Sequence, residues 1–250
     1  IQVAERLFQV IERLAENGPM GIMDLSAELG FHKSTTHRLV TSLQYMGYIR
    51  QDEESLKYAL SLKFLEIGSK ILEQTNMASL IHPSLKKLSE QTGETVHLVR
   101  REGTEAVYID KVESTVSSIR MVSRVGSRIP LYCSGVGKAL LAELPDPEIE
   151  DIWNSSEITF LTPYTVTSLS DLMDRIRGVR EAGYAMDDEE NEEGVRCIAV
   201  SIPDYHKEPV YALSISAPVS RMTDARIAEL SADVLTFKKD LEKTLGFSRS

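Results

Sequence analysis

Cysteine is scarce in this sequence, and a long hydrophobic run is missing altogether. The two cysteines, Cys133 and Cys197, match no zinc or redox spacing. No apolar stretch approaches the roughly 20 residues that a membrane-spanning helix needs. The first ten residues mix charged with apolar side chains, unlike a secretory signal peptide, and the missing initial methionine leads us to expect further N-terminal residues. We therefore expect a cytoplasmic protein with reduced thiols, no metal, no cofactor and no membrane partner.

An overall excess of positive charge is also missing. The net charge of −10 excludes a protein that binds nucleic acid over its whole surface. Residues 1–62 are nearly balanced, with six basic against eight acidic residues, so any DNA site must be a local basic patch. The 42% apolar and 26% charged residues are typical of a globular protein, and 250 residues suffice for one large or two modest domains.

Apolar periodicity and turn signals organise the first 60 residues. A helix is expected up to "ENGP", and a second over "MDLSAEL", which Gly30 would end in a left-handed conformation. A third helix is expected from Lys33 to Met46. Two short strands, "YIRQ" and "LKYAL", then enclose the acidic turn "DEES". Three helices followed by a hairpin predict a winged helix-turn-helix domain at residues 1–60.

The third helix has one apolar side and one hydroxyl-bearing, basic side. Leu39, Leu43 and Met46 define the side expected to be buried. In a helix-turn-helix, the start of the second helix meets the major groove, where its free N–H groups suit phosphates and base edges. The residues expected to contact DNA are Lys33, Ser34, Thr35, His37, Arg38, Thr41 and, at the wing, Arg50. The alternative is a solvated face whose serine and threonine merely cap the helix.

Beyond residue 60 the pattern changes. A linker helix is expected at 61–76 and an α+β domain at 77–250, because strands occur in blocks with helices before, between and after them. The expected helices cover about 78–92, 136–144, 146–154, 168–182 and 224–244. The expected strands cover 94–101, 105–113, 117–123, 196–203 and 209–218.

Several features of this second domain bear on a ligand. The small residues Ser134–Gly137 precede an apolar helix and could admit an anion to its N-terminus, although a plain turn is the simpler interpretation. Ser214 and Ser216 share one face of a strand. Apart from Asp187, the acidic run "DDEENEEG" is expected to be a solvated loop, with a metal role as the alternative. Three arginines either guide an anion or lie on the surface: Arg120, Arg124 and Arg128.

Longer motifs carry a family resemblance. The stretches "GIMDLSAELGFHKSTTHRLVTSLQYMGYI", "SRVGSRIPLYCSGVGKALLAEL" and "GYAMDDEENEEGVRCIAVSIPDYHKEPVYALSISAPVSRMT" are similar to the IclR family of bacterial transcription regulators, over nearly the whole chain. The resemblance implies a winged helix domain joined to a GAF-like effector domain with an antiparallel sheet flanked by helices. It also implies a homodimer, often a tetramer, on palindromic operator DNA. One departure is Thr36, where the family often has valine.

The same resemblance implies a binding site for a small keto-acid or sugar-acid effector. Backbone at Gly135 and Val136, next to Ser134, would bind the acid. The side chains that would complete the site are Asp187, Cys197, Ser214 and Ser216. Asp187 is unusual beside an anion, so it is either protonated or accepts a hydrogen bond from an effector hydroxyl.

The sequence therefore favours an effector-responsive transcription regulator, with a repressor favoured over an activator. Two alternatives stay open. The second domain could serve only assembly, or the protein could be an enzyme with Cys133 or Cys197 as nucleophile.

Overall fold

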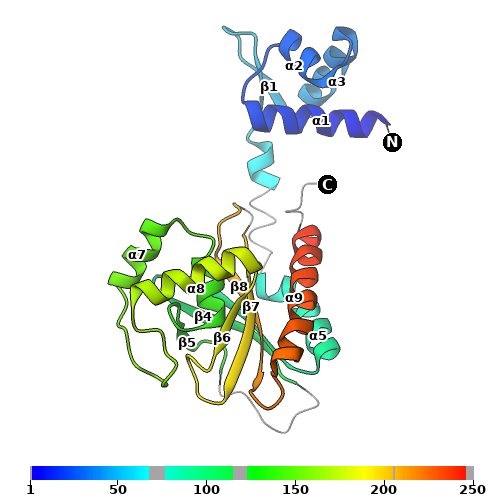
Figure 1. Cartoon of the computed structure of the whole chain (residues 1–250). Coiled ribbons are helices and arrows are strands. Elements are labelled where there is room, and N and C mark those ends of the chain that lie inside the picture. The colour runs from blue at the N-terminus through cyan, green and yellow to red at the C-terminus, as the bar shows by residue number, and fades with distance from the viewer. Residues whose placement is uncertain (1, 68–76, 115–122, 205, 246–250) are drawn as a thin grey trace. The chain divides into compact units, whose positions relative to one another are not determined.

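The computed structural model describes residues 2–67, 77–114, 123–204 and 206–245. The chain divides into two compact units, Ile1–Asn76 and Met77–Ser250 (Figure 1). The linker helix expected at 61–76 stays a prediction, because residues 63–67 are helical while 68–76 lie outside the described residues. The strand expected at 117–123 likewise lies outside them, apart from Ser123.

The first unit is a helix-turn-helix with a hairpin, as predicted. Gly30 has a φ of 65°, and its N–H closes the second helix on the carbonyls of Ala27 and Ser26, as the left-handed ending requires. The hairpin strands are antiparallel, with Ile49 opposite Leu60. The elements are α1 (Gln2–Asn17), α2 (Ile22–Leu29), α3 (Lys33–Tyr45), β1 (Ile49–Gln51) and β2 (Tyr58–Leu60).

The buried side of α3 differs from the prediction at one residue. Leu39 and Leu43 are buried as expected, but Met46 is 41% exposed, so its predicted burial was wrong. The helix ends at Tyr45, and Met46 follows as the cap, at the solvent-exposed end of the helix. Thr36 is fully buried, and its hydroxyl donates to the carbonyl of His32 at 3.4 Å. This backbone partner offsets the cost of burying a hydroxyl where the family often has valine.

The second unit is built on a six-stranded antiparallel sheet in the order β5-β4-β3-β8-β7-β6. The α+β class with helices flanking an antiparallel sheet is confirmed. Two strands were missed by the sequence reasoning, because β5 has only three residues and β6 ends at Asp188, inside the run assigned to a solvated loop. The strands are β3 (Thr95–Glu102), β4 (Glu105–Val112), β5 (Arg128–Pro130), β6 (Ala185–Asp188), β7 (Val195–Ile202) and β8 (Tyr211–Pro218).

Helices cover both faces of this sheet (Figure 1). On one face α5 packs against β3 and β4, and α9 packs against β7, around an apolar cluster that includes Ile198, Val200 and Ile215. On the other face α6 packs against Ala199 and Ala212, whose small side chains let the helix approach closely. Polar side chains occur on this second face. The helices are α5 (Met77–Thr92), α6 (Gly135–Leu141), α7 (Asp146–Asn154), α8 (Leu169–Ala182) and α9 (Asp224–Thr244).

Candidate functional sites

The polar side of α3 is open to solvent. Ser34, His37, Arg38 and Thr41 are all exposed, as is Lys33 at the first position, while Thr35 is half-buried. No side chain caps the N-terminus of the helix, whose cap position is held by His32. The serine and threonine of this turn are therefore not used for capping, and the first N–H groups of the helix stay available to an anion.

The wing is fixed next to the end of α3. Asp52 accepts hydrogen bonds from the backbone and hydroxyl of Ser55, at 2.8 and 2.6 Å, which lower the pKa of that carboxyl and hold the turn. The Lys63 ammonium lies 4.2 Å from the centre of the Tyr48 ring and donates to the Met46 carbonyl at 2.7 Å. Arg50, exposed on β1, is thus carried on a hairpin with a defined geometry.

In the second unit, a row of polar residues crosses the sheet on the face covered by α6. Asp187 of β6 lies opposite Cys197 of β7, which lies opposite Ser216 of β8, which in turn lies opposite Thr95 of β3. Paired residues on neighbouring strands share a face. Ser214 is two residues from Ser216 and thus on this face as well. The structure therefore brings together the four side chains that the sequence reasoning proposed for an effector.

The start of α6 meets the same row. A Cβ on Gly135 would lie 3.4 Å from the Asp187 backbone nitrogen and 3.5 Å from Ala199 Cβ, so the helix start lies directly over β6 and β7. Gly137 is even closer to its neighbours, because a Cβ there would lie 2.2 Å from the Leu131 carbonyl oxygen. The Ser134 hydroxyl accepts from the Gly137 N–H and donates to the Pro130 carbonyl, so it caps the helix and is already engaged.

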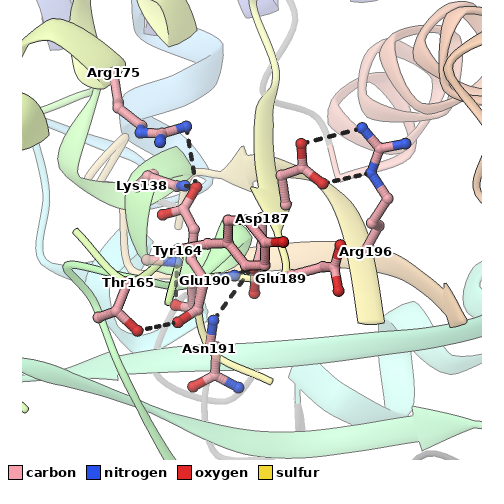
Figure 2. Close-up of polar contacts among 12 residues, drawn as sticks. Lys138, Tyr164, Thr165, Arg175, Asp187, Glu189, Glu190, Asn191 and Arg196 are labelled. Carbon is pink, nitrogen blue, oxygen red and sulfur yellow. Dashed lines mark hydrogen bonds and ion pairs between the residues drawn. The ribbon is translucent and has the colours of Figure 1, made fainter. Parts of the chain in front are cut away.

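A buried ion pair lies next to this site, in the run expected to be a solvated loop. Glu190 is fully buried, and its carboxylate binds the ammonium of Lys138, which is 1% exposed and comes from α6. Figure 2 shows Arg175 of α8 reaching the same carboxylate, at 3.3 Å. The prediction of a solvated loop was wrong for Glu190, because the loop folds over the sheet and this carboxylate pairs with Lys138 there.

The backbone of this loop is held from two sides. The N–H groups of Glu190 and Asn191 donate to Asp187 Oδ1, at 2.8 and 3.4 Å. The hydroxyl of Thr162 donates to the carbonyl of Glu189 at 2.6 Å. The hydroxyl of Thr165 donates to the carbonyl of Glu190 at 2.7 Å (Figure 2). The position of the Asp187 carboxyl is therefore set by a network of bonds that does not include any ligand.

Burial sets the protonation of Asp187. It raises the pKa of this carboxyl to about 7, against the opposing charge of Lys138, while the negative charge of Glu190 adds to the rise. Asp187 thus carries a proton for part of the time at neutral pH. A partly protonated carboxyl is compatible with an anion nearby, as one of the two alternatives from the sequence requires.

One histidine joins the polar row, although the sequence reasoning did not single it out. His97 of β3 is 3% exposed and lies opposite Ser214. Its Nδ1 is 3.4 Å from the Ser214 hydroxyl and 3.3 Å from that of Ser216. Its sequence context, "ETVHLVRR", held a usable signal, because a polar residue at an inward position of an apolar strand must have a partner. Lys138 gave a similar signal, because it is the only charged residue within the apolar stretch "GVGKALL".

The remaining candidates lie outside the site. Arg124 and Arg128 are exposed, and Arg128 pairs with Glu102 and Glu105, which fits the surface placement that the sequence left open; Arg120 lies outside the described residues. Within the described ranges, no three metal-ligating side chains come together. Among those residues, no helix has the length and apolar character to cross a membrane.

Comparison with known families finds two matches that together cover most of the chain. The family model described as the IclR helix-turn-helix domain matches residues 3–53. The model described as the C-terminal part of the bacterial transcriptional regulator IclR matches residues 69–242. The first covers α3, and the second covers the polar row and the start of α6.

Individual proteins are similar over their full length. The acetate operon repressor of Salmonella typhimurium is 36% identical over 252 residues, covering 100% of this chain and 92% of the relative. The HTH-type transcriptional regulator KdgR of Escherichia coli is 36% identical over 242 residues, covering 97% of this chain and 92% of that regulator. The crystal structure of the Thermotoga maritima IclR has a TM-score of 0.65 at 31% identity, and the match covers 98% of this chain and 99% of that one.

Proposed function

The chain belongs to the IclR family of bacterial transcription regulators, and from this premise we propose that it is a cytoplasmic repressor controlled by a small acid. In this proposal a homodimer, alone or paired into a tetramer, binds palindromic operator DNA through α3 and the wing. A keto acid or sugar acid binds in the second unit and changes operator affinity. The domains keep the predicted bounds: 1–60 for DNA, 61–76 as linker and 77–250 for effector and assembly.

The observation that carries the effector part is the polar row under the start of α6. Asp187, Cys197 and Ser216 lie side by side on three strands, and Ser214 and His97 extend the group. Backbone N–H groups at Gly135 and Val136, at a helix N-terminus, add donors suited to a carboxylate. The hydroxyls of Ser214 and Ser216 contact His97 Nδ1 and each other, and since a hydroxyl has one donor and two acceptor positions, each can also bond a bound acid.

The enzyme alternative is set aside, because the family consists of transcription regulators. The thiols do not favour nucleophilic chemistry either. Burial raises the pKa of the Cys133 thiol to about 12, and burial together with the charge of Asp187 raises the pKa of Cys197 well above its ordinary value. A measurement of ligand binding tests the alternative in which the second unit serves only assembly, because that alternative predicts that no acid binds.

Ligand and DNA binding test the proposal together. Full-length protein is expected to select a palindromic sequence from random double-stranded DNA, because each subunit of a dimer presents one α3. Among glyoxylate, pyruvate and 2-keto-3-deoxygluconate, at least one is expected to raise the melting temperature and alter affinity for the selected site, because a ligand that binds only the folded state stabilises it. Selected DNA without symmetry contradicts the dimer. If none of the acids changes the melting temperature or the DNA affinity, the effector part of the proposal is contradicted, and the alternative in which the second unit serves only assembly is favoured.

Arg38 and Arg50 are expected to affect DNA binding in different ways. Arg38 lies on the exposed face of α3, so Arg38→Ala should cost about 1–3 kcal/mol and relax the preference at one base position. Arg50 lies on the wing, so Arg50→Ala should weaken binding to all sequences alike and lower the salt slope by about one. Affinities for a panel of single-base variants at several salt concentrations measure both effects. Identical specificity profiles for the two variants contradict the assignment.

A further inference from the structure

His97 links the two serines of the candidate effector site to the next strand. The ring comes from β3, packs edge-on against Tyr108 with the ring centres 5.1 Å apart, and is buried. Its Nε2 lies 2.7 Å from the Ser123 hydroxyl, while Nδ1 faces the two serines of β8. The imidazole therefore has a polar group at each nitrogen, and only one of its two sides faces the site.

The three polar atoms at Nδ1 form a nearly equal-sided triangle. Nδ1 is 3.3 Å from Ser216 Oγ and 3.4 Å from Ser214 Oγ, and the two oxygens are 3.4 Å apart. One N–H shared between two acceptors has this arrangement. A ring nitrogen that accepts has a single lone pair, which takes a hydrogen from only one of the serines.

The ring is neutral in this environment. Burial, helped by the positive charge of Lys111, lowers the pKa of His97 to about 3. A neutral imidazole has one donor and one acceptor nitrogen, and the tautomer decides which is which. With the proton on Nδ1, the ring donates to the serine oxygens, and Nε2 accepts from Ser123. Neither serine hydrogen is then used at Nδ1. With the proton on Nε2, one serine hydrogen is used on Nδ1.

We propose that His97 is a positioning residue of the effector site, which keeps its proton on Nδ1 and so leaves the Ser214 and Ser216 hydroxyls as two parallel donors. This inference rests on the proposed function, since it concerns the same site. Two donors from one face suit a group with two acceptor oxygens and no hydrogens, which is a carboxylate. An amide offers only one such oxygen. The site therefore selects the carboxylate end of its ligand, and neutral analogues are excluded.

Two variants distinguish the nitrogens. His97→Asn places an amide at about the position of Nδ1, next to the serines, while His97→Gln places it at about the position of Nε2, next to Ser123. We expect His97→Asn to retain the affinity for the best-binding keto acid of the panel, and His97→Gln to weaken it about tenfold through a lost hydrogen bond. Both should bind the selected operator like the wild type when no acid is present. For the wild type, pyruvamide should bind far more weakly than pyruvate.

Nitrogen NMR of the full-length protein, with labelled histidine, reads the tautomer directly and does not depend on how a variant folds. A protonated Nδ1 in the acid-bound wild type is the expected result. A protonated Nε2 overturns the inference, and so does a folded His97→Gln variant that binds the acid as tightly as the wild type. In both cases the proposed function stands, since the acid still binds. If no acid of the panel binds the wild type, the proposed function fails, and this inference fails with it.

Discussion

Replacing Lys138 with methionine is expected to lower the free energy of unfolding of the second unit by about 3–5 kcal/mol. Lys138 and Glu190 are both buried, so the substitution leaves a carboxylate without its buried counterion. Glu190 Oε2 already has no hydrogen-bond partner among the described residues, which makes the remaining charge harder to accommodate. Arg175 compensates only in part, because its side chain is 48% exposed and its charge is screened by water.

Two variants serve as controls in denaturant unfolding at pH 7 and fixed protein concentration. Arg175→Met removes the exposed partner and should cost no more than about 1 kcal/mol. Lys138→Met combined with Glu190→Met removes both buried charges and should recover most of the loss, because methionines can fill a similar volume without desolvating an ion. A Lys138→Met protein as stable as Arg175→Met contradicts the importance assigned to the buried pair.

Replacing Ser214 and Ser216 together with alanine is expected to abolish most of the response to effector while operator binding persists. Each lost hydrogen bond to a charged ligand costs about 1.5–3 kcal/mol, so the two losses together should lower the affinity for the acid by about 100-fold or more. The fold should survive, because the apolar layer of β8 is formed by Leu213 and Ile215 on the opposite face. The DNA-reading helix lies in the other unit and is unchanged.

Operator affinity with and without a saturating acid measures this effect. Ser201→Ala is the matched control, since Ser201 is also a buried serine of the sheet but bonds Glu143, away from the polar row. The control should respond at the wild-type concentration of acid. If the double variant also responds at that concentration, Ser214 and Ser216 are not part of the effector site.

Local sequence signals were sufficient for most of the secondary structure. The turn at Gly30, the apolar side of α3 and the alternation of "YALSISAP" all depend on neighbours a few residues apart, where periodicity and backbone preferences act. Met46 was misplaced because apolar periodicity gives the side of a helix on which a residue lies, and it does not show whether other residues cover that position. The short strands β5 and β6 are formed through pairing with β4 and β7, which no local signal reveals.

The candidate site was predicted in part, and its assignment to an effector remains a prediction. The residues carried over by family resemblance lie together, but the groups that hold them were not found. Lys138 and Glu190 are 52 positions apart, and an acidic run is usually solvated, so composition gave the wrong environment for Glu190. His97 meets Ser214 across 117 positions, through the pairing of β3 with β8. Contacts of this kind depend on the topology of the sheet.

The alternation of β8 has a consequence for how such a protein can change over evolutionary time. Ser214 and Ser216 lie on the face with the polar row, while Leu213 and Ile215 lie in the apolar layer against α5 and α9. Under the proposed function, mutations of Ser214 and Ser216 alter which small molecule is recognised, and they leave the residues of the apolar layer unchanged. A descendant can thus acquire a new signal in single steps without passing through an unfolded ancestor.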